Sequence, residues 1–305
     1  MRKYLSTAAV VLLLGTAVMV TSSGAEEMAR GPIPGREALT DTELYAAARR
    51  ITVQVLITDE HQKLIPAGSG VWIKDGIVAT CFHVVKDSDG PVVVNVQVPD
   101  DIELPEHKAR VIPSVPLNSS ILASDPALDI ALLQVDPNGL KTLRDQKTGL
   151  HIAVAELEKD LPESGSNALL AGYPFGGPVL LARRTGIAGV GVFPDSSPGA
   201  SAFNQVRIFI GISSTLGDSG GPVLNQFGKV IGLVQGNLPG PVIDEEQRPV
   251  IYVRPVRDAA GNFVQESDGK PRLEATDLFG RSGIAAVVPA YFVSAVQAEQ
   301  SNTRR

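Results

Sequence analysis

Short apolar runs alternate with turn residues over most of the chain, from residue 51 to residue 289. Residues 68–73 and 77–80 are two such runs, and Lys74-Asp75-Gly76 between them is typical of a tight turn, so this region predicts two strands joined by a turn. Residues 51–57 form another run and predict a core strand. The pattern predicts an all-β fold.

Two short helices are expected at the ends of this strand-rich region. Asp41 can cap a helix that ends at Arg50, and residues 290–299 form the second helix. Residues 137–164 are typical of a linker, with a further strand at residues 151–154 as an open alternative. A chain of 305 residues with 44% hydrophobic content can build one large β domain or two small ones.

One glycine-rich motif, Gly217-Asp218-Ser219-Gly220-Gly221-Pro222, lies between two apolar runs. Glycine allows a positive φ and a close approach of the backbone to a ligand. Such a turn can present the Ser219 hydroxyl as a nucleophile and direct backbone N–H groups toward one point. An ordinary β-turn that contains a serine is the alternative, but six consecutive residues and two upstream partners favour a nucleophile.

His83 is the candidate general base. It lies in Thr80-Cys81-Phe82-His83-Val84-Val85, just after a predicted strand, where a rigid scaffold can hold an imidazole. The remaining histidines, His61, His107 and His151, have no comparable setting.

Asp129 is the candidate partner of that base. It precedes the apolar run 130–135, so its carboxylate will be partly buried and needs a partner. The imidazolium that forms on His83 during catalysis is such a partner. Asp125 is the alternative, but it precedes Pro126 and is typical of a turn residue.

The ordered set of motifs resembles the trypsin-like (chymotrypsin-fold) serine proteases, and within them the HtrA/Deg branch. The resemblance covers residues 41–295 and rests on residues 68–71, 80–85, 129–132, 172–176, 217–222 and 283–289. It implies two six-stranded antiparallel β-barrels with a cleft between them. His83 and Asp129 would come from the first barrel and Ser219 from the second.

The resemblance also implies a serine endopeptidase that acts on polypeptides and needs no cofactor and no metal. Ser219 would attack the scissile carbonyl, His83 would transfer the proton and Asp129 would orient the imidazole. The N–H groups of Gly217 and Ser219 would form the oxyanion hole. The alternative from another class is a secreted binding or scaffold protein that keeps the protease fold without turnover.

The resemblance sets the expected boundaries within a protease domain at residues 41–295. Barrel one is expected at about 51–136 and barrel two at about 165–289, with an insertion at 238–282 and a tail at 296–305. HtrA proteins usually continue into a PDZ domain, and none is expected after this one.

The insertion itself predicts a hairpin. Residues 250–256 and 263–264 are expected to pair around a turn at 258–262. This segment is either a surface excursion or a flap or exosite beside the cleft, because long loops often carry function.

Asp218 departs from the HtrA pattern, which has asparagine before the serine. In digestive trypsin-like enzymes that aspartate pairs with a new N-terminus made by cleavage. Arg50-Ile51 resembles a cleavage point, but Ile51 opens the predicted first strand and would lie too close to the barrel to reach Asp218. The sequence leaves the partner of Asp218 open.

The residues expected to line the substrate pocket are uncharged. By the resemblance, Ser213 lies at the base with Ser214 and Leu216 after it, and Val234, Gln235 and Gly236 form the opposite wall. A buried cation would need a carboxylate there, whereas an apolar side chain needs only a dry slot. Cleavage after apolar residues is therefore expected.

The N-terminal region predicts export. Residues 1–25 combine a basic start, a short apolar run and small residues before a cleavage site, which is typical of a signal peptide. An uncleaved membrane anchor is the alternative. Residues 26–40 are a spacer. We expect a periplasmic or extracellular protein without membrane contact after cleavage.

Charge and cysteine content exclude some partners and leave others open. The net charge of −6 argues against nucleic acid as a partner. Nothing in the sequence supports an oligomer. Cys81 is the single cysteine, so it forms no intramolecular disulfide; a small buried residue is the favoured interpretation and redox control the alternative.

Overall fold

The computed structural model describes residues 37–97, 102–104, 109–111, 114–145, 152–193, 205–241, 251–256, 264–266, 270–277 and 279–303. The expected signal peptide, most of the spacer, the expected turn at 258–262, His107 and His151 lie outside the described residues. None of the helices in the described part of the chain has the length and hydrophobicity to cross a membrane.

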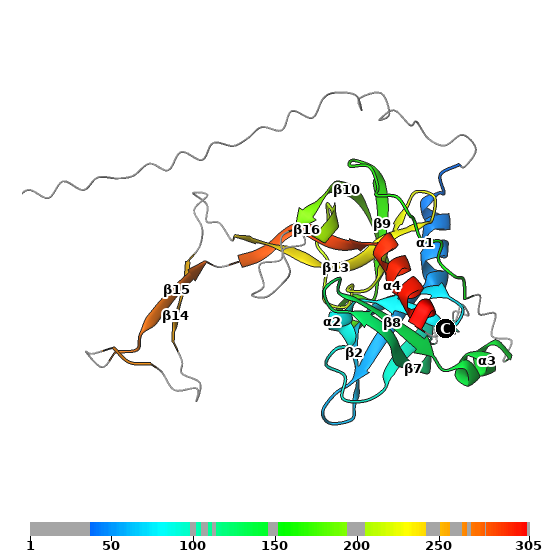
Figure 1. Cartoon of the computed structure of the whole chain (residues 1–305), viewed down its shortest axis with the longest axis horizontal. Helices are drawn as coiled ribbons and strands as arrows, with labels where there is room; N and C mark the ends of the chain where they lie inside the picture. The colour runs from blue at the N-terminus through cyan, green and yellow to red at the C-terminus, as the bar shows by residue number, and fades with distance from the viewer. Residues whose placement is uncertain are drawn as a thin grey trace, which may run out of the picture. The chain divides into compact units, whose positions relative to one another are not determined.

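The first half of the chain forms a closed six-stranded antiparallel barrel. Its strands are β1 (Thr52–Thr58), β2 (Leu64–Lys74), β3 (Ile77–Thr80), β4 (Val92–Gln97), β7 (Ser114–Asp125) and β8 (Ile130–Val135), hydrogen-bonded in the order β1-β2-β3-β8-β7-β4. Figure 1 labels β2, β7 and β8 of this barrel. Helix α2 (Phe82–Val85) follows β3 directly, and β5 (Ile102–Leu104) pairs with β6 (Ala109–Val111) as a separate ribbon. All four residues of β3 are buried, as a continuous apolar run predicts.

The second half forms another closed barrel of six antiparallel strands. Its members are β9 (Asn167–Gly172), β10 (Leu181–Phe193), β11 (Gln205–Ile210), β12 (Pro222–Asn225), β13 (Val230–Pro241) and β16 (Phe279–Pro289), in the order β10-β11-β16-β13-β12-β9. A short 3-10 helix η1 (Pro174–Gly176) follows β9. The predicted all-β fold of two six-stranded barrels is therefore confirmed, together with its C-terminal helix.

The N-cap of helix α1 (Asp41–Ile51) lies one residue earlier than expected. Thr40, not Asp41, is the N-cap, and it forms a capping box in which the Glu43 N–H donates to Thr40 Oγ1 over 3.3 Å. Asp41 instead places negative charge in the first turn, where the helix dipole favours it. The helix includes Ile51, so β1 starts at Thr52.

The segment between the barrels and the insertion also differ from expectation. Residues 137–145, expected as linker, form helix α3 (Pro137–Asp145), and residues 152–154 form no strand. In the insertion, β14 (Ile251–Pro255) pairs with β15 (Leu273–Asp277), and just after β14 the Val264 N–H donates to the Val256 carbonyl over 2.9 Å. Val264 therefore contacts the expected run, but the strand that pairs with β14 lies further along the chain than the local turn signals indicated.

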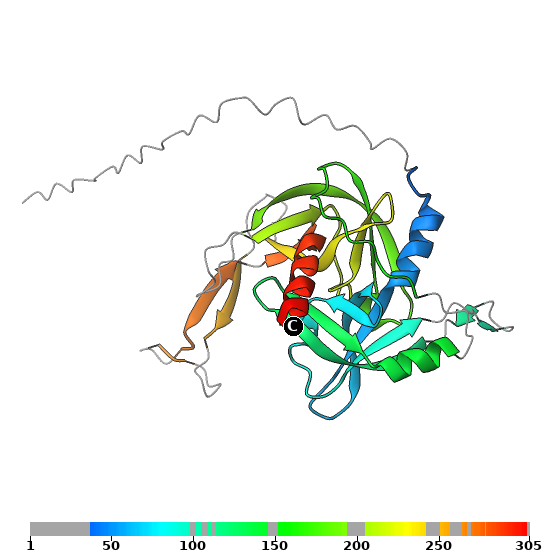
Figure 2. The ribbon, with the colours of Figure 1, turned by 45° about the vertical axis from the view of Figure 1, so that its right-hand side comes forward.

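A shared apolar core joins the two barrels. One cluster of buried residues combines β1, β2, β3 and β8 with Leu169, Leu233 and Val288 of the second barrel. Helix α4 (Ala290–Thr303) adds Val293 and Val296 to this cluster and contacts β7, β8 and β13 (Figures 1 and 2). The helix extends four residues past its expected end at residue 299.

Candidate active site

The three residues expected to react come from three connections between strands. His83 lies in α2, immediately after β3. Asp129 ends the turn between β7 and β8, and Ser219 lies in the loop between β11 and β12. The first two positions belong to barrel one and the third to barrel two, as the resemblance implied.

The structure brings His83 and Asp129 into direct contact. His83 Nδ1 lies 2.8 Å from Asp129 Oδ2, and the backbone N–H of His83 donates to Asp129 Oδ1 over 2.9 Å. The Asp129 side chain is 12% exposed and the His83 side chain 40%. The carboxylate thus fixes both the ring and the backbone of His83, while the ring keeps one side open to solvent.

Local geometry distinguishes Asp129 from Asp125, the alternative partner of His83. The backbone of Asp129 is left-handed, with φ of 61°, which aspartate tolerates better than most residues. Its carbonyl accepts the N–H of Phe82 over 3.1 Å. Asp125 instead accepts the N–H groups of Ala127 and Leu128 with Oδ1, as a turn residue does. Only Asp129 of this pair faces the histidine.

The loop that carries Ser219 is shaped by two glycines with positive φ. Gly217 has φ of 97° and Gly220 has φ of 80°. A Cβ at Gly217 would overlap the carbonyl of Tyr173, and one at Gly220 would overlap the carbonyl of Ser69. Both positions therefore need glycine for conformation and for space.

The Ser219 hydroxyl donates to the carbonyl of Gln235 over 3.3 Å, and among the described residues it has no hydrogen bond to His83. In the same described part of the chain, the N–H groups of Gly217 and Ser219 donate to no protein acceptor. Hydrogen bonds between a nucleophile and its base are often longer before substrate binds.

Ser69 of β2 connects this loop to the first barrel. Its N–H donates to the Ser219 carbonyl over 2.8 Å, and its hydroxyl donates to the Gly217 carbonyl over 2.6 Å. The same hydroxyl accepts the N–H of Tyr173 over 2.9 Å. One buried serine therefore holds the carbonyls on both sides of Asp218.

Asp218 is fully buried and has a charged partner, which the sequence had left open. The guanidinium of Arg183, on β10, forms an ion pair with Asp218 Oδ2. The N–H and the hydroxyl of Thr215 donate to the same oxygen over 2.6 and 2.8 Å. The positive charge that pairs with Asp218 thus comes from a side chain of the same protein and not from a new N-terminus.

Cys81 lies behind the His83–Asp129 pair and is completely buried. Its thiol donates to the carbonyl of Val234 over 3.2 Å. Burial, and then the negative charge of Asp129, raise the pKa of this thiol well above its usual range. Ligand atoms of Cys81, His83 and Asp129 lie within 4.8 Å of one another, but a metal would need the thiolate, which this environment disfavours.

The expected pocket residues occupy different environments. Ser214 is buried, and its N–H and carbonyl are held by the Asn237 side chain over 2.6 and 2.8 Å. Val234 packs its side chain in the core of the second barrel, so only its backbone can face a substrate. Leu216 is 72% exposed, and a Cβ at Gly236 would meet open space.

Two arginines lie beside this wall. Arg183 approaches the Ser213 carbonyl over 3.5 Å as well as Asp218. The buried Arg207 donates to Gln235 Oε1 over 2.7 Å. The uncharged wall residues did not reveal these cations, because Arg183 reaches the site from β10 and Arg207 from β11.

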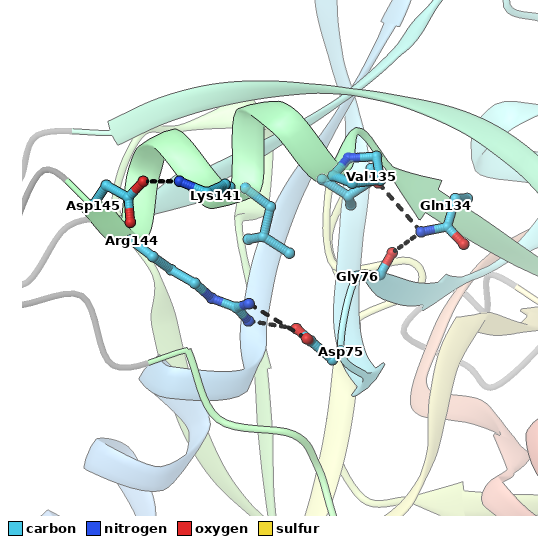
Figure 3. Close-up of a pocket in the computed structure, with 9 residues that line it drawn as sticks. Asp75, Gly76, Gln134, Val135, Lys141, Arg144 and Asp145 are labelled. Carbon is cyan, nitrogen blue, oxygen red and sulfur yellow. Dashed lines mark hydrogen bonds and ion pairs between the residues drawn. The ribbon is translucent and has the colours of Figure 1, made fainter.

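A separate pocket of about 240 Å³ lies between the β2–β3 turn and α3, and it contains none of the expected site residues. Figure 3 shows that Arg144 points toward Asp75 and Lys141 toward Asp145, so each charged side chain that lines the pocket has an opposite charge beside it. The amide of Gln134 donates to the Gly76 carbonyl over 3.0 Å.

Two closed six-stranded barrels with a histidine–aspartate pair on one and a glycine-framed serine on the other define a chymotrypsin-like protein. A family model described as "Trypsin-like peptidase domain" matches residues 68–233, more than half of the chain. The chain therefore belongs to the trypsin-like peptidase domain family.

Relatives and solved structures agree with this family. Over 181 residues the chain is 32% identical to the uncharacterized protein y4bJ of Sinorhizobium fredii, covering 56% of this chain and 22% of y4bJ. It is 31% identical to a probable periplasmic DegP-like serine endoprotease of Pseudomonas fulva, covering 54% of this chain and 28% of the relative. The active form of the Rv3671c protease of M. tuberculosis matches with a TM-score of 0.55 at 18% identity, covering 88% and 90% of the two chains.

The chain thus spans less than a third of the length of these two sequence relatives. The similarity to HtrA/DegP-like serine proteases is confirmed, and the solved structure supports the fold.

Sequence reasoning missed the contacts that support the serine loop, which come from Thr215 within the loop and from Ser69, Arg183 and Asn237 outside it. Ser69 lies inside the recognised Gly68-Ser69-Gly70 motif, so the sequence indicated its position but not its role. Arg183 lies within the expected second barrel, but no local signal pairs it with Asp218.

Proposed function

We propose that this protein is an exported serine endopeptidase in which Ser219 is the nucleophile and His83 the general base. The observation that carries the proposal is the contact between His83 Nδ1 and Asp129 Oδ2 at 2.8 Å, in a chain whose family is that of trypsin-like peptidases. A carboxylate at Nδ1 fixes the tautomer that leaves Nε2 free to accept a proton.

The proposed reaction is acyl transfer. Ser219 Oγ attacks the scissile carbonyl carbon, and its proton passes to Nε2 of neutral His83. The imidazolium, stabilised by Asp129, then donates this proton to the leaving amine, and water hydrolyses the acyl-enzyme by the same route.

Stabilisation of the tetrahedral oxyanion is assigned to the N–H groups of Gly217 and Ser219. Both donors are available in the described structure, since neither is used by a protein acceptor. The positive φ of Gly217 and the contacts of Ser69 with the Gly217 and Ser219 carbonyls support a fixed loop. Preorganised donors of this kind usually contribute a factor of about 10²–10³ to kcat.

The proposed preference is for apolar residues before the scissile bond. The wall residues Ser213, Ser214, Gln235 and Gly236 are uncharged, and the charge of Arg183 is neutralised by Asp218. Arg207 is buried and binds Gln235, which keeps its charge out of an open slot. An apolar side chain then needs only a dry surface.

Export to the periplasm or the extracellular space is proposed from residues 1–25, and the periplasmic DegP-like relative is consistent with it. Polypeptides are the proposed substrates. Nucleic acid and membrane lipid are not expected as partners of the mature protein, whose net charge is negative.

The experiment that tests the activity is a digest of an unfolded polypeptide, with the cleavage sites identified by mass spectrometry. Wild-type protein should cut within the chain, mostly after Val, Ala, Leu or Phe. Ser219→Ala should lower kcat by roughly 10⁴–10⁶-fold, and His83→Ala by about as much, because the residues act as a unit.

The matched controls are Ser120→Ala on β7 and His61→Ala, since both residues are exposed and lie outside the proposed site. Both should digest the polypeptide like wild type. If Ser219→Ala kept more than about a tenth of the wild-type activity, the assignment of Ser219 as the nucleophile would be wrong. A dominant preference for Arg, Lys, Asp or Glu would contradict only the pocket assignment.

One observation favours the alternative of a binding or scaffold protein: the Ser219 hydroxyl is directed to the Gln235 carbonyl and not to His83. If this arrangement persists when a peptide binds, the serine is not activated. In that case wild-type protein would bind unfolded polypeptide without cleaving it, and Ser219→Ala would bind it equally well.

A further inference from the structure

The segment between Ser213 and Ser219, termed here the oxyanion loop, depends on one buried charge. Asp218 lies between the two proposed oxyanion donors and is 0% exposed. A buried carboxylate is tolerated only when it is paired and hydrogen-bonded. All the donors that the structure gives to its side chain reach Oδ2, from Arg183 and Thr215, while Oδ1 is buried without a hydrogen-bond partner.

Arg183 supplies the positive charge of this arrangement from outside the loop. It extends from β10, where its backbone pairs with Leu170 of β9, so its Cα is fixed by the barrel. Its guanidinium contacts Asp218 near one end of the oxyanion loop and the Ser213 carbonyl, at 3.5 Å, at the other end. A single guanidinium group therefore contacts both ends of the oxyanion loop.

The alternative source of positive charge, a new N-terminus at Ile51, conflicts with the structure. Ile51 is the last residue of α1, is 5% exposed and packs in the shared core. Cleavage before Ile51 would create a new ammonium group there, and moving this group to Asp218 would take Ile51 out of the core. The carboxylate already has an internal partner, so no cut is needed to satisfy it.

We infer that Arg183 is a positioning residue that holds the oxyanion loop in its reactive conformation through Asp218, so that the intact chain needs no proteolytic activation. This inference rests on the proposed function for its effect on catalysis. Its structural part, the ordering of residues 213–219 by Arg183, stands independently of turnover.

The test compares Arg183→Met with Arg184→Met in the full chain without any protease treatment. Arg184 is the matched control, because it is the next residue on β10 and pairs with Asp41 of α1 instead. Arg183→Met should lower kcat for peptide hydrolysis by about 10²-fold, the effect of losing oxyanion donors, while KM changes less than about threefold. Arg184→Met should stay within about twofold of wild type in both constants.

Hydrogen exchange of the peptide that contains residues 213–219, read by mass spectrometry, reports the loop without requiring activity. Arg183→Met should exchange at least about tenfold faster there than wild type or Arg184→Met, with unchanged exchange in β3 and β8. Adding Asp218→Asn to Arg183→Met removes the unpaired charge and should recover at least about tenfold in kcat. A merely structural role of Arg183 would not give this recovery.

The outcomes separate the two proposals. If wild type hydrolyses peptides and Arg183→Met matches it in kcat and exchange, the inference is wrong and the proposed function stands. If wild type is inactive, the proposed function fails, and the exchange data alone decide whether Arg183 orders the loop. Activity that appears only after N-terminal cleavage would also overturn the inference. Should Arg183→Met not fold, Arg183→Lys is judged instead, with an expected loss of about tenfold in kcat.

Discussion

At the scale of single residues, the site places polar groups where water cannot reach them. Cys81 is the clearest case after Asp218, because its thiol is fully buried and hydrogen-bonded to the Val234 carbonyl. Burial and the adjacent Asp129 charge raise the pKa of the thiol well above its usual range. The folded protein therefore binds the thiol proton of Cys81 more tightly than the unfolded chain does.

This property predicts a pH-dependent stability. In the unfolded chain the thiol ionises at about pH 8.5, whereas the folded protein retains the proton, so the unfolded state gains stability as pH rises above that value. Between pH 7.0 and 9.5 the free energy of unfolding should fall by about 1.4 kcal/mol more for wild type than for Cys81→Ser. Urea unfolding of both proteins at the two pH values measures the difference.

Cys81→Ser is the appropriate comparison because it keeps a hydrogen-bond donor for the Val234 carbonyl. Burial also raises the pKa of Tyr173, but this tyrosine is present in both proteins, so its contribution cancels in the comparison. Identical pH dependence in the two proteins would show that the Cys81 thiol ionises as easily in the folded state as in the unfolded state.

At the scale of elements, strands β13 and β16 pair beyond the residues expected for the barrel. Their ladder runs from Gly232 and Pro289 to Pro241 and Phe279. The ends of the insertion are therefore neighbours in an antiparallel pair, and β14 is paired with β15 inside it. The barrel strands complete their own hydrogen-bonded order without these two strands.

This arrangement predicts that residues 242–278 can be removed. Joining Pro241 to Phe279 through a two-glycine turn should give a folded protein, because the pairing of these residues already brings the ends together. Thermal unfolding should shift by only a few degrees, and hydrolysis of a small ester should stay within about threefold of wild type. Cleavage of folded protein substrates should change if the insertion contacts them.

The deletion is best compared with a variant that keeps residues 242–278 and carries the same two glycines inserted after Pro241. Loss of folding in the deletion alone would show that the insertion is part of the barrel structure. Unchanged selection among protein substrates would leave it as a surface excursion without a role in recognition.

At the scale of the molecule, local sequence patterns were sufficient for the all-β class, and the resemblance carried by the motifs supplied the two barrels. The strands, the turn at Lys74-Asp75-Gly76 and the choice of His83, Asp129 and Ser219 follow from apolar runs and short motifs, whereas the two barrels were implied by the resemblance. Residues adjacent in sequence determine these features, so a single chain reveals them.

Contacts between distant segments could not be predicted in the same way. Ser69 and Gly217 are 148 positions apart, and Arg183 and Asp218 are 35 apart, yet both pairs shape the same loop. For a related reason the local turn residues did not reveal β15 as the strand that pairs with β14. Such pairings depend on how strands close into barrels, which local propensity does not specify.

The central claim, that Ser219 is an activated nucleophile, is tested most directly by labelling with a fluorophosphonate, followed by mass spectrometry of the modified peptide. Activated serines of this mechanism react with such a probe, whereas ordinary surface serines do not. We predict stoichiometric modification of Ser219 in the wild-type protein, normal labelling of Ser120→Ala and none of Ser219→Ala or His83→Ala. A folded wild-type protein that remains unmodified at Ser219, or is modified at another residue, would contradict the account.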